Sequence, residues 1–257
     1  MSTPNVVLIF GAGKRVGAGV AAKFASNGHK VAVVSRSGTG SINEQGYLSL
    51  KADVNDPTSI APAFDAVQAE FKIAPNVVVY NAGALHFPSN FKSVLSIPAV
   101  DVASDLNANT VSPFAAAQEA VERWETLPRD IKKTFIFTGN ALNELVVPFP
   151  SWMNLGMGKS ATAYWINFAD KAYKAKGYRF FYADERKADG TADGEIDGPY
   201  HGEFYAHLAS HEGNVPWQAT FVKDKGYVYF DPKSIDLDKV WEMNQEVQAG
   251  IAKKLGQ

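Results

Sequence analysis

The sequence predicts an α/β protein with a doubly wound parallel sheet in a three-layer α/β/α arrangement. Apolar runs of strand length alternate with stretches of helical periodicity along most of the chain. These apolar runs are nearly continuous, which is typical of parallel strands that helices cover on both faces. The 257 residues contain no repeat, low-complexity tract or linker, so we expect a single domain over residues 1–257.

Each predicted element corresponds to one apolar run or one helical period. The predicted strands are Asn5–Phe10, Lys30–Ser35, Leu48–Leu50, Asn76–Tyr80, Thr134–Thr138, Tyr178–Tyr182 and Tyr227–Phe230. The predicted helices are Val16–Ser26, Thr58–Lys72, Asp101–Trp124, Ser160–Lys176 and Asp236–Lys254. The loop-like segment Gly190–Gly198 lies in the remaining stretch, and we interpret it as a surface excursion beside a site.

The composition excludes several classes of function. The 25 Lys and Arg residues nearly balance 27 Asp and Glu residues, so no general attraction to nucleic acid is expected. The absence of cysteine excludes disulfides, thiolate metal sites and a cysteine nucleophile. No stretch approaches the roughly 18 apolar residues of a membrane span, and the first residues lack the basic region of a secretory signal. We therefore expect a cytoplasmic protein without a membrane partner.

A glycine-rich loop directly follows the first predicted strand. Phe10 ends that strand, and the segment Gly11–Gly17 (GAGKRVG) leads into the first helix. Glycines allow a tight turn and close approach of backbone N–H groups, and a helix N-terminus attracts the pyrophosphate of a dinucleotide. The loop therefore predicts a dinucleotide-binding site.

The whole chain resembles the short-chain dehydrogenase/reductase family, whose members have a Rossmann fold and a Gly-x-x-x-Gly-x-Gly loop. Gly13, Gly17 and Gly19 match this spacing literally. That register, however, puts Lys23 at a helix position that is buried in the family. A register that begins at Gly11 is preferred, with Arg15 replacing the middle glycine as in pteridine-reductase-like members. The resemblance then implies these cofactor contacts in the loop: Gly11, Gly13, Lys14, Arg15, Val16 and Gly17.

Further positions of the family follow in order. The resemblance implies that Asp53 and Val54 hold the adenine and that Asn81, Ala82 and Gly83 form the Asn-Ala-Gly strand end beside the cofactor. The remaining implied contacts are Thr138 and Ala183, at the ends of two later strands, and Lys159, which by resemblance bonds the nicotinamide ribose.

The family also has an active-site asparagine, which distorts its helix and holds a water. Asn109 matches this position, and Asn107 is the rival by spacing. The residues that follow, Phe114 and Gln118, favour Asn109.

The end of the second strand indicates which nicotinamide cofactor is used. NAD-binding members place a carboxylate there for the ribose hydroxyls, whereas NADP-binding members place basic groups for the 2′-phosphate. Here the strand ends in Ser35, Arg36 and Ser37, and Lys14 supplies a second cation from the glycine loop. No acidic residue precedes Glu44, so this opening segment is strongly basic in a nearly neutral protein. We therefore expect NADPH.

The family's catalytic pair, Tyr-x-x-x-Lys, is incomplete. Lys159 is present, but Leu155 occupies the position of the tyrosine that protonates the carbonyl oxygen. The serine that orients the carbonyl is also missing, since alignment by strand gives Asn140 and counting back from Leu155 gives Leu142.

The usual Pro-Gly after the sixth strand of the family is replaced by Asp184 and Glu185. The predicted catalytic set is therefore Lys159, Asn109, Asn140, Asp184 and Glu185.

The missing tyrosine favours a substrate that needs no proton. Hydride transfer to a ketone forms an alkoxide, whereas an iminium ion becomes a neutral amine without proton donation. A carboxylate from Asp184 or Glu185 would pair with such a cation. The pattern is similar to that of divergent reductases of prenylated indole alkaloid biosynthesis. Recruitment of another acid (His86, Tyr182 or Tyr200), an inactive NADPH-binding sensor or scaffold, and a non-redox catalyst are the alternatives.

The region between about 186 and 222 is interpreted as a substrate lid. Aromatic residues are dense from there to the last strand: Tyr200, Phe204, Tyr205, Trp217, Phe221, Tyr227, Tyr229 and Phe230. The residues of this set outside the strand favour a small aromatic or cyclic substrate. Glu203, His207 and His211 share a helical face, but a polar outer face is the simpler interpretation, so no metal is expected. By resemblance, the helix at Ser160–Lys176 forms the interface of a homodimer or homotetramer.

Overall fold

The computed structural model describes residues 3–146, 149–192 and 194–236, together with residues 242, 245, 249–251, 253 and 254. Most of the helix expected at Asp236–Lys254 lies outside the described residues. None of the helices in the described part combines the length and the apolarity that a membrane crossing requires.

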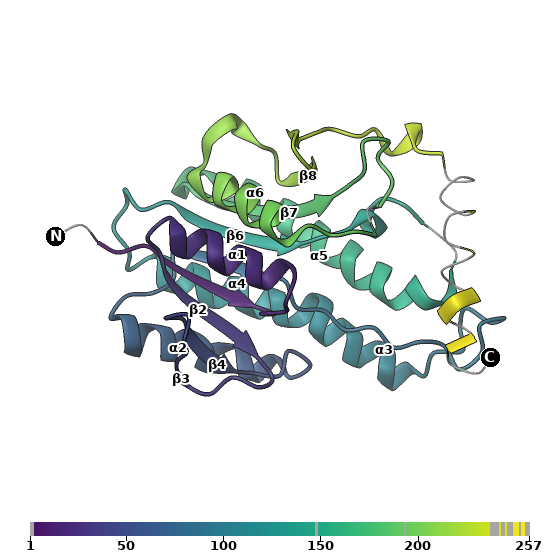
Figure 1. Ribbon diagram of the computed structural model, residues 1–257, viewed down its shortest axis with the longest axis horizontal. Coiled ribbons are helices and arrows are strands. Elements are labelled where there is room, and N and C mark those ends of the chain that lie inside the picture. Colours follow the sequence, from purple (N-terminus) through teal and green to yellow (C-terminus); the bar gives the residue numbers. More distant parts are fainter. Residues whose placement is uncertain are drawn as a thin grey trace.

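One twisted sheet forms the centre of the described part of the chain (Figure 1). Its strands lie in the order β3-β4-β2-β1-β5-β6-β7-β8-β9, and all neighbours pair in parallel except at the two edges, where β3 and β9 are antiparallel. The strands are β1 Val6–Phe10, β2 Lys30–Ser35, β3 Ser41–Ile42, β4 Leu48–Lys51, β5 Val77–Tyr80, β6 Lys133–Thr138, β7 Tyr178–Glu185, β8 Gln218–Val222 and β9 Gly226–Tyr227. This order confirms the doubly wound α/β fold expected from the sequence.

Helices cover both faces of the sheet. The α-helices are α1 Val16–Ser26, α2 Ile60–Phe71, α3 Ala99–Leu106, α4 Ser112–Trp124, α5 Met153–Tyr173 and α6 Gly198–Ser210. Helices α1 and α6 lie side by side on one face (Figure 1), while α2, α4 and α5 cover the other. Short 3-10 turns lie at Pro57–Ser59, Ala141–Asn143, Pro150–Trp152, Lys174–Lys176, Glu212–Asn214 and Pro232–Ser234.

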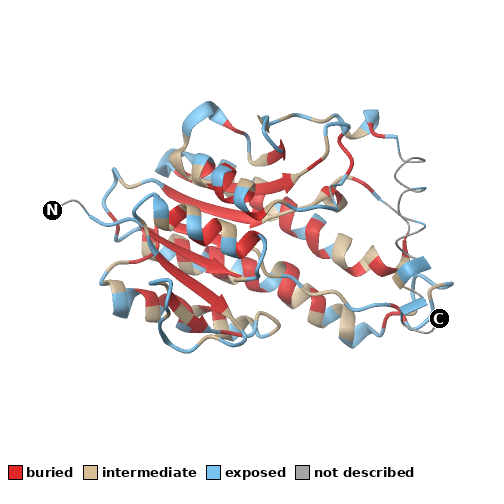
Figure 2. Ribbon diagram, viewed as in Figure 1, coloured by how far each residue is buried: buried red, intermediate tan, exposed pale blue. Residues whose placement is uncertain are grey.

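The strands between the two edges are largely buried, which explains their nearly continuous apolar sequences (Figure 2). In β1, Val6, Leu8 and Phe10 point into the core under α2, α4 and α5. Val7 and Ile9 point into the opposite core under α1 and α6. Because successive side chains of a strand face opposite sides, each strand supplies both cores.

Two predicted boundaries were wrong. Helix α5 begins at Met153 rather than near Ser160, so the Leu155 and Lys159 positions both lie within it. The strand predicted at Tyr227–Phe230 is reduced to Gly226–Tyr227, which pairs with β8, a strand that the sequence interpretation had assigned to the lid region. The alternation of strands with helices along the chain predicted a single strand in this region. The short β8–β9 hairpin does not follow this alternation, because no helix separates its two strands.

The helix expected at Asp101–Trp124 is interrupted by a π-helical segment. Residues Asn107–Val111 form this segment between α3 and α4. Insertions of this kind are uncommon and occur frequently at functional sites. The distortion expected around Asn109 is therefore present.

Candidate active site at the carboxyl edge of the sheet

The glycine loop lies against the end of β5. Gly11 has a φ of 91°, and a β-carbon there would come within 2.5 Å of the Ala82 backbone nitrogen. A β-carbon on Gly17 would likewise overlap the carbonyl oxygen of Gly11, whereas Gly13 faces open space. Asn81 Nδ2 donates a hydrogen bond of 2.8 Å to Gly11 O. This packing favours the register that begins at Gly11.

The N-terminus of α1 is suited to an anion. Its first turn contains no acidic residue, and no side chain caps it. The backbone N–H groups at such a terminus, together with the helix dipole, favour negative charge. The glycine loop and the N-terminus of α1 therefore form a site that fits the pyrophosphate of a dinucleotide.

Three basic residues of the opening segment lie in or near the glycine loop and the end of β2. Lys14, Arg15 and Arg36 are exposed, and none of them forms an ion pair with an acid of the described chain. Ser35 Oγ and Ser37 Oγ lie 3.4 Å apart at the end of β2. These cations and hydroxyls are free to bind a phosphate.

The expected adenine contacts lie after β4. Asp53 is exposed, and its Oδ1 accepts a hydrogen bond of 3.0 Å from the Asn55 backbone nitrogen. Val54 is partly buried, and its carbonyl oxygen accepts a hydrogen bond of 2.7 Å from Ser112 Oγ. The position of this loop is thus fixed to the start of α4.

Asn109 joins three elements of the site. Its buried side chain exchanges two hydrogen bonds with the backbone of Ala84, at 2.8 Å and 3.1 Å, directly after the Asn81–Gly83 strand end. Its carbonyl oxygen accepts a hydrogen bond of 2.8 Å from Thr162 Oγ1 on α5. Asn107, the rival, instead donates to Asn55 O at 3.1 Å. The structure brings Asn109 and not Asn107 to α5.

Lys159 is buried against the end of β6. Its Nζ donates a hydrogen bond of 2.7 Å to Thr138 O and lies 4.4 Å from the centre of the Phe137 ring. Burial lowers the pKa of Lys159 to about 8, and the nearby charge of Asp184 partly offsets this effect. Thr138 Oγ1 also accepts a hydrogen bond of 2.9 Å from the Tyr205 hydroxyl, which connects this point to α6.

Asp184 and Glu185 point to opposite faces of β7, as consecutive residues of a strand must. Glu185 faces α6, where its Oε2 accepts a hydrogen bond of 3.3 Å from the Asp197 backbone nitrogen and lies 3.5 Å from His201 Nδ1. Asp184 lies on the α5 side, where it interacts with the charge of Lys159. The structure therefore does not bring the two predicted carboxylates together.

Asp184 belongs to a buried cluster of charges. Its Oδ2 accepts a hydrogen bond of 2.6 Å from Arg186 Nε, and Arg186 also donates at 2.8 Å to Glu144 Oε2. Burial raises the pKa of Asp184 to about 6, against the opposing effect of Arg186. Asp184 Oδ1 is buried and has no hydrogen-bond partner among the described residues. Neither Arg186 nor Glu144 was predicted. Only the fold brings Glu144 to this cluster, whereas Arg186 lies two residues after Asp184 and could have been found from the alternation of side chains along an extended strand.

A second polar cluster lies at the start of α5. His86 Nδ1 and Asp105 Oδ1 are 2.7 Å apart, and the His86 backbone nitrogen donates at 2.7 Å to Asp105 Oδ2. Asn154 Nδ2 donates to the same Asp105 oxygen. Asp105 and Asn154 are fully buried, whereas 44% of the His86 side chain is exposed. Sequence reasoning named His86 but missed both partners, although Asp105 lies one helical turn before Asn109 and Asn154 one turn before Gly158.

Comparisons with known proteins show the family of the chain. The family model for short chain dehydrogenases matches residues 5–139. The short chain dehydrogenase/reductase dmxR12 of Cryptosporiopsis sp. (strain 8999) is 40% identical over 241 residues, which cover 90% of this chain and 96% of that protein. The chain belongs to the short-chain dehydrogenase/reductase family. Family membership places it among the oxidoreductases.

Solved structures of the family share the fold. A short chain dehydrogenase from Burkholderia cenocepacia, in complex with NADP, has a TM-score of 0.67 at 20% identity and covers 86% of this chain and 97% of its own. The 3-ketoacyl-(acyl-carrier-protein) reductase from Brucella melitensis, complexed with NADH, has a TM-score of 0.69 at 17% identity and covers 85% of this chain and 96% of its own. The two relatives hold different nicotinamide cofactors, so they do not decide between them.

Other residues stand where a short-chain dehydrogenase/reductase is expected to have its catalytic tyrosine and serine. Leu155, one turn before Lys159 on α5, carries no proton donor. Gly139 follows β6, and a β-carbon there would overlap the ring of Tyr182. Asn140 Oδ1 accepts a hydrogen bond of 3.1 Å from the Leu142 backbone nitrogen, so its side chain caps the next turn.

Two of the alternative acids are held by backbone contacts. The Tyr182 hydroxyl donates to Asn140 O at 2.8 Å and accepts from Asn140 N at 3.1 Å, and burial raises the pKa of Tyr182 well above its usual value. The Tyr200 hydroxyl accepts a hydrogen bond of 2.8 Å from Gly226 N. Tyr182 is therefore a poor proton donor, while His86 presents its ring to solvent.

Part of the aromatic set assigned to a lid is core. Phe204 and Tyr205 on α6 and Phe221 on β8 are 3%, 0% and 0% exposed, and they belong to the core between the sheet and the helices α1 and α6. They therefore cannot close over a substrate. In the same region His211 Nε2 forms a hydrogen bond of 2.8 Å with Thr134 Oγ1.

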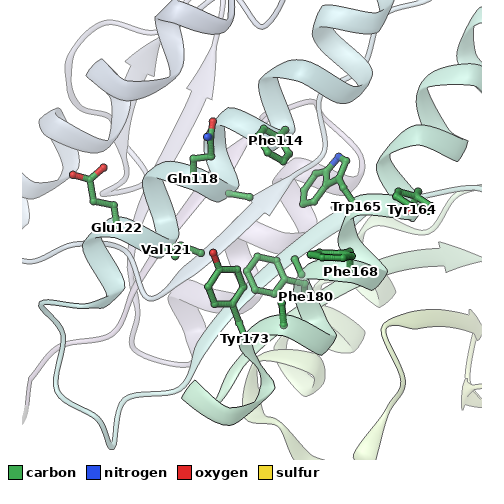
Figure 3. Close-up of a pocket in the computed structure, with 12 residues that line it drawn as sticks. Phe114, Gln118, Val121, Glu122, Tyr164, Trp165, Phe168, Tyr173 and Phe180 are labelled. Carbon is green, nitrogen blue, oxygen red and sulfur yellow. The ribbon is translucent and has the colours of Figure 1, made fainter.

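An apolar cavity of about 650 Å³ lies away from this edge, between α4 and α5 (Figure 3). Phe114, Trp165 and Phe168 line it, and the rings of Phe114 and Trp165 meet edge to face at 5.6 Å. Phe168 and the neighbouring Tyr164 are 68% and 77% exposed. This outer surface of the two helices is unusually apolar for a surface in contact with water.

Proposed function

We propose that the chain is an NADPH-dependent reductase with a non-standard active site, acting on an imine, an iminium ion or an activated carbonyl of a small aromatic or cyclic molecule. One observation carries the proposal: Lys159 is retained and buried at the cofactor edge, while Leu155 gives its helix no proton donor. The binding end of the cofactor site is thus intact and the reacting end altered.

The preference for NADPH follows from the unpaired cations around the glycine loop. Lys14 and Arg36 would pair with the 2′-phosphate, with Ser35 and Ser37 as hydrogen-bond donors. Asp53 would hold the adenine, and Asn81 would keep the loop against β5. When bound, the reduced nicotinamide supplies a hydride.

The substrate preference follows from the lack of a proton donor at the position of the family's tyrosine, Leu155. An iminium carbon accepts hydride without protonation, so the absence of the tyrosine does not slow this reaction as it would slow ketone reduction, by about 10²–10⁴-fold. Asp184 is the carboxylate on the Lys159 side of β7, although Arg186 already neutralises part of its charge. We do not assign Glu185 the role of pairing with the substrate cation, because its side chain faces α6.

The test follows NADPH absorbance with a panel of cyclic imines, N-methyl iminium salts and activated ketones. NADPH oxidation with the imines is expected, at a rate that Leu155→Tyr does not change. Tight NADPH binding without oxidation by any of the substrates would contradict the proposal.

A second candidate function is an inactive NADPH-binding sensor or scaffold. Leu155 favours it, because this position has no polar side-chain atom to act on a carbonyl. A non-redox catalyst that uses the cofactor as a wall of its pocket would show product formation without NADPH consumption.

We propose further that two copies of the chain associate through the outer faces of α4 and α5. The exposed aromatics Phe114, Tyr164 and Phe168 make this surface suitable for an isologous contact with a second copy. A cytoplasmic location, expected from the sequence, is a prediction that a fluorescent fusion would test.

A further inference from the structure

The His86–Asp105 pair lies at the helical level of the missing tyrosine. Asn154 on α5 contacts Asp105 on α3, and one turn later Gly158 contacts Asn109, because a β-carbon at Gly158 would come within 2.6 Å of Asn109 Cβ. Two successive turns of α5 thus contact α3 and the π-helical segment that follows it. Leu155 directly follows Asn154 in α5, so the contact between Asn154 and Asp105 belongs to the same helical turn as Leu155.

Asp105 is held as an acceptor. Its Oδ1 faces His86 Nδ1, and its Oδ2 accepts from the His86 backbone nitrogen and from Asn154. Both oxygens of this fully buried carboxylate are thus engaged by neighbouring polar groups. A carboxylate in this position favours the tautomer with the proton on Nδ1 and orients the ring.

The other ring nitrogen is available for chemistry. His86 Nε2 makes no hydrogen bond to any residue that the structure describes, and 44% of the side chain is exposed. The ring is therefore anchored on one side and open on the other. A proton lost from Nε2 can be replaced from solvent.

We propose that His86 is the proton donor of this site and that Asp105 is its positioning residue, which makes ketones substrates alongside iminium ions. The proposal rests on the proposed reductase function. As hydride reaches the carbonyl carbon, the π electron pair moves to oxygen, and the Nε2–H bond of the imidazolium breaks to form the O–H bond of the alcohol. His86 is left as a neutral imidazole that regains a proton from solvent.

A spectroscopic test needs no cofactor. In imidazole ¹H–¹⁵N spectra of the apoprotein, one of the five histidine signals disappears in His86→Gln and identifies His86. Its Nδ1 should have the shift of a protonated nitrogen at every pH at which the protein is folded, and Asp105→Asn should abolish this preference. A neutral His86 with its proton on Nε2 would overturn the role of Asp105.

A kinetic test compares a ketone with the N-methyl iminium salt of the same ring system. His86→Gln should lower the ratio of the ketone rate to the iminium rate by about 10²-fold or more. His207→Gln, an exposed histidine on α6, is the matched control and should leave the ratio unchanged. An unchanged ratio in His86→Gln, with ketone reduction retained, would overturn this proposal alone. Wild-type protein that reduces neither compound would refute the reductase function and this proposal with it.

Discussion

The ring of Tyr182 occupies the space beside Gly139 in which a side chain would lie. Its hydroxyl is bonded to both backbone groups of Asn140, so the ring is fixed in place. The side-chain space beside Gly139 is thus filled by a residue of β7.

Gly139→Ala is expected to destabilise the protein by about 1–3 kcal/mol, because overpacking displaces Tyr182 or the β6 backbone. Gly13→Ala is the control, because a β-carbon at Gly13 would face open space and the φ of this residue is not positive, so alanine can adopt it. Urea unfolding would measure both. Equal free energies of unfolding for the two variants would show that Tyr182 is not fixed against Gly139.

Substitution of Lys14 and Arg36 tests the cofactor preference. In Lys14→Ala/Arg36→Ala, NADPH affinity should fall by about 10²-fold, because two charge-assisted contacts are lost, whereas NADH affinity should be unchanged. The affinity is measured by titration of protein fluorescence at fixed salt. Wild-type protein that binds NADH as tightly as NADPH would refute the preference.

Burial of Lys159 should make the free protein less stable than a variant without this charge. Burial lowers the pKa of Lys159 from 10.5 in the unfolded chain to about 8 in the folded protein. Below pH 8 the lysine is charged in both states, and its charge lowers the free energy of unfolding by about 3 kcal/mol. This cost is constant below pH 8 and disappears as the pH rises from 8 to above 10.5. Lys159→Met should therefore be more stable than wild type in urea at pH 7, and the difference should shrink toward pH 10.

The same shift predicts how cofactor binding depends on pH. The protonated lysine is the form that donates to a ribose hydroxyl with its charge, so NADPH affinity should fall as the pH rises through about 8. In Lys159→Met the affinity should be lower and show no such step. A step of equal size in the variant would assign it to another group.

Phe168→Glu tests the proposed contact between copies. The new charge in the apolar surface of α4 and α5 should reduce the molecular mass in solution to that of one chain. Tyr229→Glu is the matched control, because Tyr229 is an exposed aromatic outside that surface, at 72%. Light scattering that finds wild-type protein already monomeric would remove the proposed interface.

Local pattern predicted the first half of the fold well. The bounds of α1 and β2 agree with those expected from the sequence. The start of α5 was missed because two glycines, Gly156 and Gly158, lower helix propensity in its first turns. Packing explains the second of them, since Asn109 leaves no room for a side chain at 158. That contact joins residues distant in sequence and is invisible to local periodicity.

The candidate site was predictable where it follows motif spacing. The glycine loop, Asn109 and Lys159 lie together as the family resemblance implied. The orientation of Asp184 and Glu185 was not predictable, because it depends on how far β7 continues beyond Tyr182. The partner of His86 also depends on the fold, which brings α3 to the loop after β5.

The most direct test of the central claim is the transfer of deuterium from NADPH labelled at nicotinamide C4. Wild-type protein incubated with an N-methyl iminium salt should form an amine that carries one deuterium, detected by mass spectrometry, in step with NADPH oxidation. Product without deuterium, or tight binding of NADPH with no product, would contradict the claim that the chain is a reductase that works without the family's tyrosine.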